Sequence, residues 1–242
     1  MKFIQIKFSV KSFILKNNIH KYRWLIFDAD NTLFDYDKAE KLALLKTLDT
    51  FGVIYDKNSI VETYHKINHK LWMQFEQGIV KSQDEIKIKR TTRLFEILNF
   101  SGDVVKFADS YLFNLSQNGH LLANAFEVVE KLSKTHDLMI MTNGMTNVQK
   151  PRFAAAPIAQ FFQHIIISQE IGHSKPSKEI FRHAFELMKQ PSKVEVLMIG
   201  DNLGSDVQGG INFGIDTVWF NPNKKQENHK ATYEVRNLLE FV

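Results

Sequence analysis

The sequence contains no cysteine among its 242 residues and no long apolar run. The absence of cysteine excludes disulfide bonds and thiolate catalysis within the chain, and it is compatible with a reducing cytoplasm. No stretch approaches the roughly 18 consecutive apolar residues that a membrane-spanning helix requires. Near the N-terminus, Lys7 and Lys11 interrupt the apolar positions, so a secretory signal peptide is not expected. These absences predict a cytoplasmic protein that is not attached to a membrane.

The chain also has little excess charge of either sign. Its 31 Lys and Arg residues against 27 Asp and Glu residues give a formal net charge of +4. The lysines are spread along the chain, so we expect solvated faces and no patch that binds a nucleic acid polymer. With 44% hydrophobic and 24% charged residues, the composition is ordinary for a globular protein of one large domain, or one domain with an insert.

An acidic turn directly follows the first strongly apolar run of the chain. The run Trp24–Phe27 is bounded by turn-type residues, which is typical of a buried strand in a parallel sheet. Asp28 and Asp30 follow this strand at its carboxyl end, where open α/β sheets place their ligands. Two carboxylates two residues apart repel each other, and keeping both ionised requires a cation. The pair therefore indicates a metal site, although an acidic turn without function is the plain alternative.

Residues 37–117 contain no strand-like run and predict a block of helices. Apolar residues from Ile60 to Phe75 recur at three- and four-residue steps, as on one face of a helix. Ser82 and Glu85 have the spacing of a capping box, and Ser101 is a candidate start for a further helix.

From about residue 121 the pattern changes to alternating helices and short apolar strands. Such alternation is typical of βαβ units that form a parallel sheet. We therefore expect an α/β fold: a doubly wound, Rossmann-like, mostly parallel sheet with the helical block inserted after its first strand. The expected later strands are residues 138–141, 165–167, 196–199 and 217–220.

Residues 1–20 precede this core. Apolar and polar residues alternate from Ile4 to Lys11, which is the period of a strand. An extra edge strand, a loose tail and an overlong start are all open for this N-terminal extension, and its role is unknown.

Polar residues also follow the later strands. Residues 142–144 offer a hydroxyl, backbone N–H groups and a glycine, which together suit phosphate oxygens. Asp201 and Asp206 follow the run 196–199 and supply carboxylate oxygens, the ligands that Mg²⁺ prefers. Lys175 lies in a loop bounded by glycine and proline that could direct it toward a dense anionic centre. Taken singly, each is also explained as a turn or a solvated charge.

In order along the chain, these residues resemble the four motifs of the haloacid dehalogenase (HAD) superfamily, whose members are mostly Mg²⁺-dependent phosphohydrolases. The resemblance runs from about Lys21 to the C-terminus. It implies an α/β catalytic core of residues 21–36 and 118–242, with an α-helical cap of residues 37–117. The residues that carry it are Asp28 and Asp30, Thr142, Lys175, and Asp201 with Asp206.

The resemblance implies hydrolysis of a phosphomonoester through an aspartyl-phosphate. Asp28 would be the nucleophile. Asp30 would protonate the leaving group and then deprotonate the attacking water. The phosphate would be bound by Thr142, Asn143 and Lys175.

It also implies Mg²⁺ as the cofactor. The ion would take oxygens from Asp28, the backbone carbonyl of Asp30 and Asp201. Asp206 would lie further out and orient Lys175 or a metal-bound water. The side chains of Asn31 and Thr32 are interpreted as turn and helix-start residues.

Three segments resemble a narrower subgroup, the noncanonical pyrimidine 5′-nucleotidases. They are residues 27–35 (FDADNTLFD), residues 71–78 (LWMQFEQG) and residues 209–222 (GGINFGIDTVWFNP). Two segments depart from it: residues 150–157, with two prolines where a regular helix is expected, and His173-Ser174 before Lys175. The subgroup implies a nucleoside 5′-monophosphate as the small phosphorylated substrate.

Several alternatives stay open. They are a sugar-phosphate or other small phosphomonoester phosphatase, a phosphomutase, a 2-haloacid dehalogenase and a non-catalytic binding module. A dehalogenase would need no leaving-group acid and no Mg²⁺, so Asp30 argues against it. The oligomeric state is not predicted.

Overall fold

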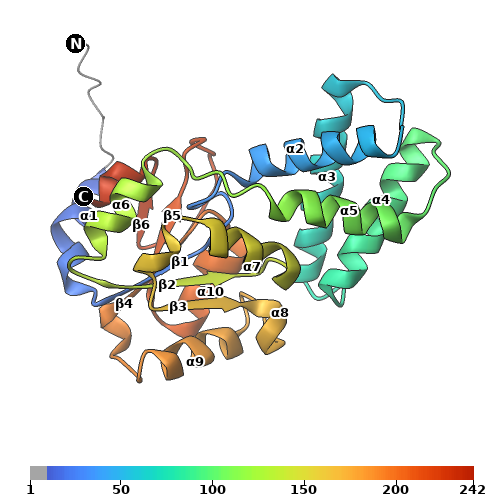
Figure 1. Ribbon diagram of the computed structural model, residues 1–242. Helices are drawn as coiled ribbons and strands as arrows, with labels where there is room; N and C mark the ends of the chain where they lie inside the picture. Colours follow the sequence, from blue (N-terminus) through green and yellow to red (C-terminus); the bar gives the residue numbers. More distant parts are fainter. Residues whose placement is uncertain (1–9) are drawn as a thin grey trace, which may run out of the picture. The chain divides into compact units, whose positions relative to one another are not determined.

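The computed structural model describes residues 10–242, which form two compact units (Figure 1). We call them the α/β unit and the helical unit. The α/β unit contains the described residues up to Phe34, together with Leu121–Thr142 and Pro157–Val242. The helical unit contains Asp35–His120 and Asn143–Ala156. No helix within residues 10–242 is both long enough and apolar enough to cross a membrane.

The α/β unit is built on a sheet of six parallel strands in the order β3-β2-β1-β4-β5-β6. This order is that of the doubly wound Rossmann fold, so the predicted fold class is confirmed. The five expected strands are present, and a sixth, β6, was not predicted. The strands are β1 (Trp24–Phe27), β2 (Asp137–Thr142), β3 (His164–Ile167), β4 (Val196–Gly200), β5 (Asp216–Phe220) and β6 (Tyr233–Val235).

Apolar side chains cover both faces of this sheet. Successive residues of a strand point to opposite faces, so Ile26 and Phe27 enter two different layers. Ile26 packs in a cluster with Phe181 and Phe185 of α9, whereas the Phe27 ring lies 6.2 Å from that of Phe241 in η5. Burial on both sides explains why β1 is a continuous apolar run.

The helices of this unit are α1 (Val10–Asn18), α6 (Ala125–Leu132), α8 (Ser168–Ile171), α9 (Lys178–Leu187) and α10 (Gln208–Phe213). The short 3-10 segments are η1 (Ile19–Lys21), η2 (Ala159–Phe161), η3 (Lys193–Glu195) and η5 (Leu238–Phe241), and η4 (Leu203–Val207) is a π-helical turn.

The N-terminal extension ends in a helix. Helix α1 contacts β6 and η5 and buries Leu15 completely. The predicted strand-like alternation lies mostly at residues 4–9, outside the described residues. For Val10 and Lys11, at its end, the strand interpretation is wrong, because both belong to α1.

The helical unit contains the helices expected for residues 37–117. The apolar stripe of α3 is confirmed, because Ile60, Tyr64 and Leu71 are buried in one core cluster. Ser82 caps α4 by accepting the Glu85 N–H at 3.1 Å, as its spacing predicts. The helices are α2 (Tyr36–Thr50), α3 (Lys57–Glu76), α4 (Gln83–Leu98), α5 (Val104–Ser116) and α7 (Thr146–Ala155).

Two details of the helical prediction are corrected. Helix α5 is capped by Asp103, whose carboxylate accepts the Lys106 N–H at 2.9 Å, and not by Ser101. The segment 143–156, which was assigned to the α/β core, groups with the helical unit because α7 packs against α5. Met145 and Val148 join the apolar core of that unit, and Pro151 is accommodated inside α7.

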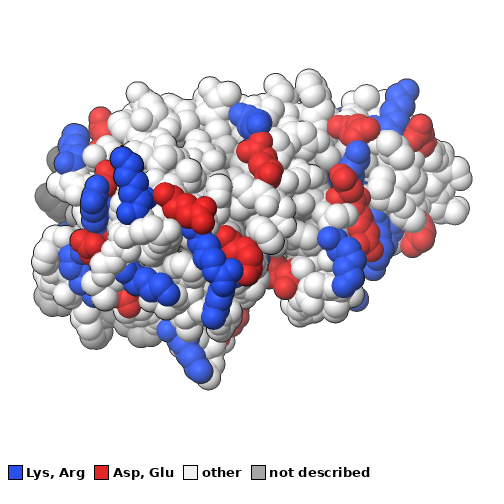
Figure 2. Space-filling model, turned by 90° about the horizontal axis from the view of Figure 1, so that it is seen from below, with Lys and Arg blue, Asp and Glu red and all other residues white. Residues whose placement is uncertain are grey.

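Charged side chains of both signs intermingle on the face drawn in Figure 2. Ion pairs also form between residues of the same helix, such as Lys66 with Glu62 at 2.6 Å in α3 and Lys89 with Glu85 at 2.5 Å in α4. Exposed pairs of this kind contribute little to stability. They show that these helix faces are in contact with solvent.

Candidate active site

The acidic residues meet where the strand order of the sheet reverses. Strands β1 to β3 extend the sheet in one direction, and β4 to β6 extend it from β1 in the other. Asp28 follows β1 and Asp201 follows β4, its neighbour, with Phe27 level with Ile199. The Asp28 N–H donates to the Ile199 carbonyl at 2.8 Å, which holds the two strand ends together. Such a switch point is the usual ligand site of an open α/β sheet.

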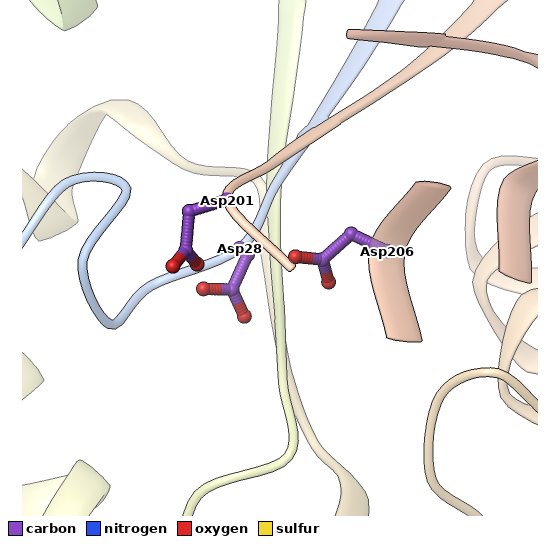
Figure 3. A group of neighbouring side chains, drawn as sticks. All are labelled: Asp28, Asp201 and Asp206. Carbon is purple, nitrogen blue, oxygen red and sulfur yellow. The ribbon is translucent and has the colours of Figure 1, made fainter. Parts of the chain in front are cut away.

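Three carboxylates converge at this point (Figure 3). Asp28, Asp201 and Asp206 each offer one oxygen, and these atoms all lie within 4.8 Å of one another. Asp206 belongs to η4, and its Oδ2 accepts the Asn202 N–H at 3.0 Å. Asp28 is 8% and Asp206 1% exposed. Asp201 is half-buried. A cluster of carboxylates suits a hard divalent cation, because oxygen is its preferred ligand.

Lys175 lies at the same place. Its ammonium is 2.5 Å from Asp28 Oδ1, 2.7 Å from Asp206 Oδ1 and 2.7 Å from the Met141 carbonyl oxygen. The contacts with Asp28 and Met141 are hydrogen bonds, and the contact with Asp206 is an ion pair. The side chain is 1% exposed, so it is no solvated surface charge. The structure therefore brings Lys175 together with carboxylates that precede and follow it in the sequence.

Burial and mutual repulsion shift the acid–base equilibria of this group. Burial raises the pKa of Asp28 to about 7, with Asp206 and Asp30 adding to the rise and Lys175 opposing it. Burial, followed by the charges of Asp28 and Asp206, raises the pKa of Asp201 well above its ordinary value. When all are ionised, three carboxylates against one ammonium leave an excess of two negative charges. A bound divalent cation would neutralise that excess and hold the carboxylates in their ionised form.

Asp30, the remaining acidic candidate, lies in the turn after β1. Asn31 adopts a left-handed conformation with φ 58°, and its N–H donates to the Phe34 carbonyl at 2.7 Å, which agrees with its interpretation as a turn residue. The Asp30 carboxylate is not among the three that converge. Thr32, interpreted together with Asn31 as a turn and helix-start residue, lies in the same turn; it is completely buried, and its hydroxyl is 3.5 Å from Asp201 Oδ1.

The candidate phosphate ligands after β2 fall in different units. Thr142 is the last residue of β2 and is 1% exposed. Asn143, the next residue, groups with the helical unit, where its carbonyl accepts a hydrogen bond from Gln83 Nε2 at 3.3 Å. The roles of Thr142 and Asn143 toward phosphate therefore stay predictions.

Two further residues shape the site and were not assigned from the sequence. A Cβ on Gly200 would stand 2.1 Å from Asp206 Oδ2, so only glycine leaves room for that carboxylate. The indole N–H of Trp219 donates to the backbone carbonyl of Asp201 at 3.0 Å. Sequence signals were present in both cases, since Gly200 directly precedes Asp201 and Trp219 lies in one of the subgroup-like segments.

Comparison with known proteins identifies the family of this chain. A family model described as haloacid dehalogenase-like hydrolase matches residues 25–220. The pyrimidine 5′-nucleotidase PynA of Streptococcus pneumoniae is 35% identical over 224 residues, which cover 91% of this chain and 94% of that protein. The pyrimidine 5′-nucleotidase YjjG of Escherichia coli is 30% identical and covers 91% of this chain and 96% of its own length.

A solved structure shares the fold over most of its length. The crystal structure of the HAD-hydrolase YfnB from Bacillus subtilis, bound to magnesium, superposes with a TM-score of 0.85 at 34% identity. The match covers 90% of this chain and 96% of YfnB. The chain therefore belongs to the haloacid dehalogenase-like hydrolases and is an enzyme of their phosphatase type.

Proposed function

We propose that this protein is a Mg²⁺-dependent phosphomonoester hydrolase that acts through an aspartyl-phosphate on Asp28. The observation that carries the proposal is the convergence of Asp28, Asp201 and Asp206 at the switch point of the sheet, with Lys175 paired to Asp28 and Asp206. The excess of negative charge and the all-oxygen donor set fit a divalent cation. Bound Mg²⁺ would supply charge neutralisation for an anionic nucleophile and an anionic substrate.

The residues that would hold Mg²⁺ are Asp28, Asp201 and the backbone carbonyl of Asp30. Asp206 lies close enough to belong to the same charge cluster, and its ion pair with Lys175 supports a role in orienting that lysine. A lysine held by two carboxylates and one carbonyl has little freedom to move. It would therefore present a fixed positive charge to the phosphoryl group.

In the first half of the reaction, a carboxylate oxygen of Asp28 attacks phosphorus. The bond between phosphorus and the ester oxygen breaks, and the departing oxygen takes a proton from Asp30. Lys175 and Thr142 bind the non-bridging oxygens of the phosphoryl group, with Asn143 completing the set.

In the second half, Asp30 takes a proton from water as that water attacks phosphorus. The bond from phosphorus to Asp28 breaks, which releases inorganic phosphate and restores the free carboxylate. One residue can act as acid and then as base because the leaving oxygen and the attacking water would occupy the same position opposite Asp28 in turn.

We further propose a nucleoside 5′-monophosphate with a pyrimidine base as the substrate. The support is the 30–35% identity to two pyrimidine 5′-nucleotidases over about nine-tenths of each chain. Other small phosphomonoesters are the second candidate, because a relative at 26% identity is a ribulose-1,5-bisphosphate 5-phosphatase.

Phosphate release from a panel of substrates tests both parts. The panel contains pyrimidine and purine nucleoside monophosphates, sugar phosphates and 2-phosphoglycolate, each with Mg²⁺ and again with EDTA. We expect release that depends on Mg²⁺ and is fastest with a pyrimidine nucleotide. Full activity in EDTA would refute the metal site, and a faster sugar phosphate would refute the substrate assignment alone. Conversion of a sugar phosphate to its isomer would identify a phosphomutase instead.

A further inference from the structure

Trp219 contacts the backbone of Asp201 although it lies in a different strand. Its indole N–H donates to the Asp201 carbonyl at 3.0 Å, and the side chain is only 2% exposed. Strand register places Trp219 level with Gly200, the residue before Asp201. Because indole has a donor and no acceptor, this hydrogen bond fixes which way the Asp201 peptide faces. The direction of that peptide sets the direction in which the Asp201 side chain leaves the backbone.

The same indole packs against the segment that carries Asp206. Trp219 forms a small apolar cluster with Val207 and Ala231, and Leu203 packs against it. Leu203 and Val207 are the first and last residues of η4, the π-helical turn that contains Asp206. On its other side, the indole lies 4.7 Å from the His229 ring, measured between centroids. One side chain therefore touches the backbone of one acidic residue and the turn that holds another.

We propose that Trp219 is a positioning residue that aims the Asp201 carboxylate at a bound divalent cation and holds the turn that keeps Asp206 beside Lys175. This role rests on the metal site of the proposed function. The ends of β1 and β4 must be held at a fixed separation for Asp28 and Asp201 to share one ion, and η4 must keep Asp206 beside Lys175. Outer partners of metal ligands typically contribute 10- to 100-fold to metal affinity. The hydrogen bond to Asp201 and the packing on η4 give Trp219 the means to do so.

Direct metal binding tests this role without recourse to turnover. Mn²⁺ is titrated into the full-length protein, with free Mn²⁺ followed by its EPR signal, and Mg²⁺ is then added as a competitor. The test variant is Trp219→Phe, which keeps most of the bulk and removes the donor. The matched control is Trp24→Phe, since Trp24 is 6% exposed, lies at the start of β1, and its indole nitrogen has no hydrogen-bond partner among residues 10–242.

We expect Trp219→Phe to weaken Mn²⁺ and Mg²⁺ binding about tenfold and Trp24→Phe to change it less than twofold. Affinity within twofold of wild type in Trp219→Phe would overturn the positioning role and leave the metal site standing. An equal loss in both variants would also overturn it, because the effect would then follow from losing any buried tryptophan. A wild-type protein that binds neither ion would overturn the metal site of the proposed function and this role with it.

A second measurement tests the same role if the Trp219→Phe variant does not fold. In a Trp24→Phe/Trp72→Phe chain, Trp219 is the remaining tryptophan, because the sequence has three. Mg²⁺ is expected to shift its fluorescence emission, since the indole is hydrogen-bonded to the residue that would ligate the ion. Emission that stays unchanged while Mn²⁺ binds would contradict the proposal.

Discussion

The ammonium of Lys175 lies 2.5 Å from a carboxylate oxygen of Asp28, and both side chains are nearly buried. The two residues are 147 positions apart in the sequence. Burial alone would lower the pKa of Lys175, but Asp206 and Asp28 reverse the effect and raise it, so the lysine stays charged. A charged lysine between two carboxylates offsets part of the repulsion that the acidic cluster builds up.

Replacement of this lysine should therefore lower the stability of the metal-free protein while strengthening the stabilisation by a bound cation. Lys175→Met leaves three carboxylates without their counter-charge, and breaking a buried ion pair costs about 3–5 kcal/mol. We expect a lower melting temperature without divalent ions and turnover reduced at least about a hundredfold. Because the remaining site is more negative, Mg²⁺ should raise the melting temperature of the variant more than that of the wild type. Calorimetric melting with and without Mg²⁺ measures this, and a smaller Mg²⁺ effect in the variant would contradict the charge argument.

Asp28→Asn removes the proposed nucleophile with little change in volume. We expect turnover to fall at least about a thousandfold, because an amide oxygen cannot form the acyl-phosphate. Asp109→Asn is a suitable control, since Asp109 is 57% exposed and pairs with Lys87 at the surface. Release of phosphate near the wild-type rate by Asp28→Asn would remove the nucleophile assignment.

Asp30→Asn should leave the nucleophile intact and remove the acid and base. Substrates with a good leaving group, such as p-nitrophenyl phosphate, need no protonation to transfer their phosphoryl group to Asp28. Hydrolysis of the intermediate still requires a base, so phosphoenzyme should accumulate in this variant. Intact-protein mass spectrometry after rapid acid quenching detects the added phosphoryl group. If Asp30→Asn turns over at the wild-type rate, the acid–base role belongs to another residue.

Gly200→Ala tests how closely Asp206 approaches the backbone of β4. The new Cβ would lie 2.1 Å from Oδ2 and 2.3 Å from Cγ of Asp206, so that carboxylate must move. We expect a loss of about 1–3 kcal/mol of unfolding free energy from overpacking and a clear fall in turnover. Gly119→Ala is the control, because its nearest neighbour would be at an ordinary 3.8 Å. Urea unfolding and phosphate release measure both effects. Equal stability and equal turnover in Gly200→Ala and Gly119→Ala would show that the close approach of Asp206 to Gly200 does not matter for folding or activity.

The main features of the fold could be predicted because they follow from local pattern. The apolar run Trp24–Phe27 is buried on both faces, and such a run can be recognised as a strand without knowing which strands pair with it. Strand β6 was missed because it has only three residues and a central Glu234. The place of α7 was missed because helix-forming pattern does not say which unit a helix packs against.

The candidate site divides in the same way. Asp28 and Asp201 could be nominated because each follows an apolar strand, and parallel strands bring their carboxyl ends to one edge. Lys175 could be nominated from its loop, which is bounded by glycine and proline and follows α8. The contact of Trp219 with Asp201 depends on strand register, and the close approach of Asp206 to Gly200 depends on the π-helical turn. Neither the strand register nor the π-helical turn can be predicted from the spacing of residues in the sequence.

Asp216, at the start of β5, should make stability depend on acid pH. Burial alone would raise its pKa, but hydrogen bonds from Tyr22 at 2.6 Å, Thr232 at 3.0 Å and Lys21 at 3.3 Å lower it overall. A carboxyl whose pKa is lower in the folded than in the unfolded chain stabilises the fold above the unfolded value of about 3.9. That contribution is lost as the pH falls through the folded pKa, because the proton then binds both states equally.

We therefore expect Asp216→Asn to lower the free energy of unfolding by about 1–2 kcal/mol at pH 7 and by less at pH 3. Urea unfolding at both pH values measures the difference between variant and wild type. Asp109→Asn again serves as control, since the Asp109 side chain is 57% exposed and an ion pair screened by solvent contributes little at either pH. A difference that is the same at pH 7 and pH 3 would show that Asp216 acts through packing or neutral hydrogen bonds. A difference that shrinks toward pH 3 is specific to a carboxylate held ionised by Tyr22, Thr232 and Lys21.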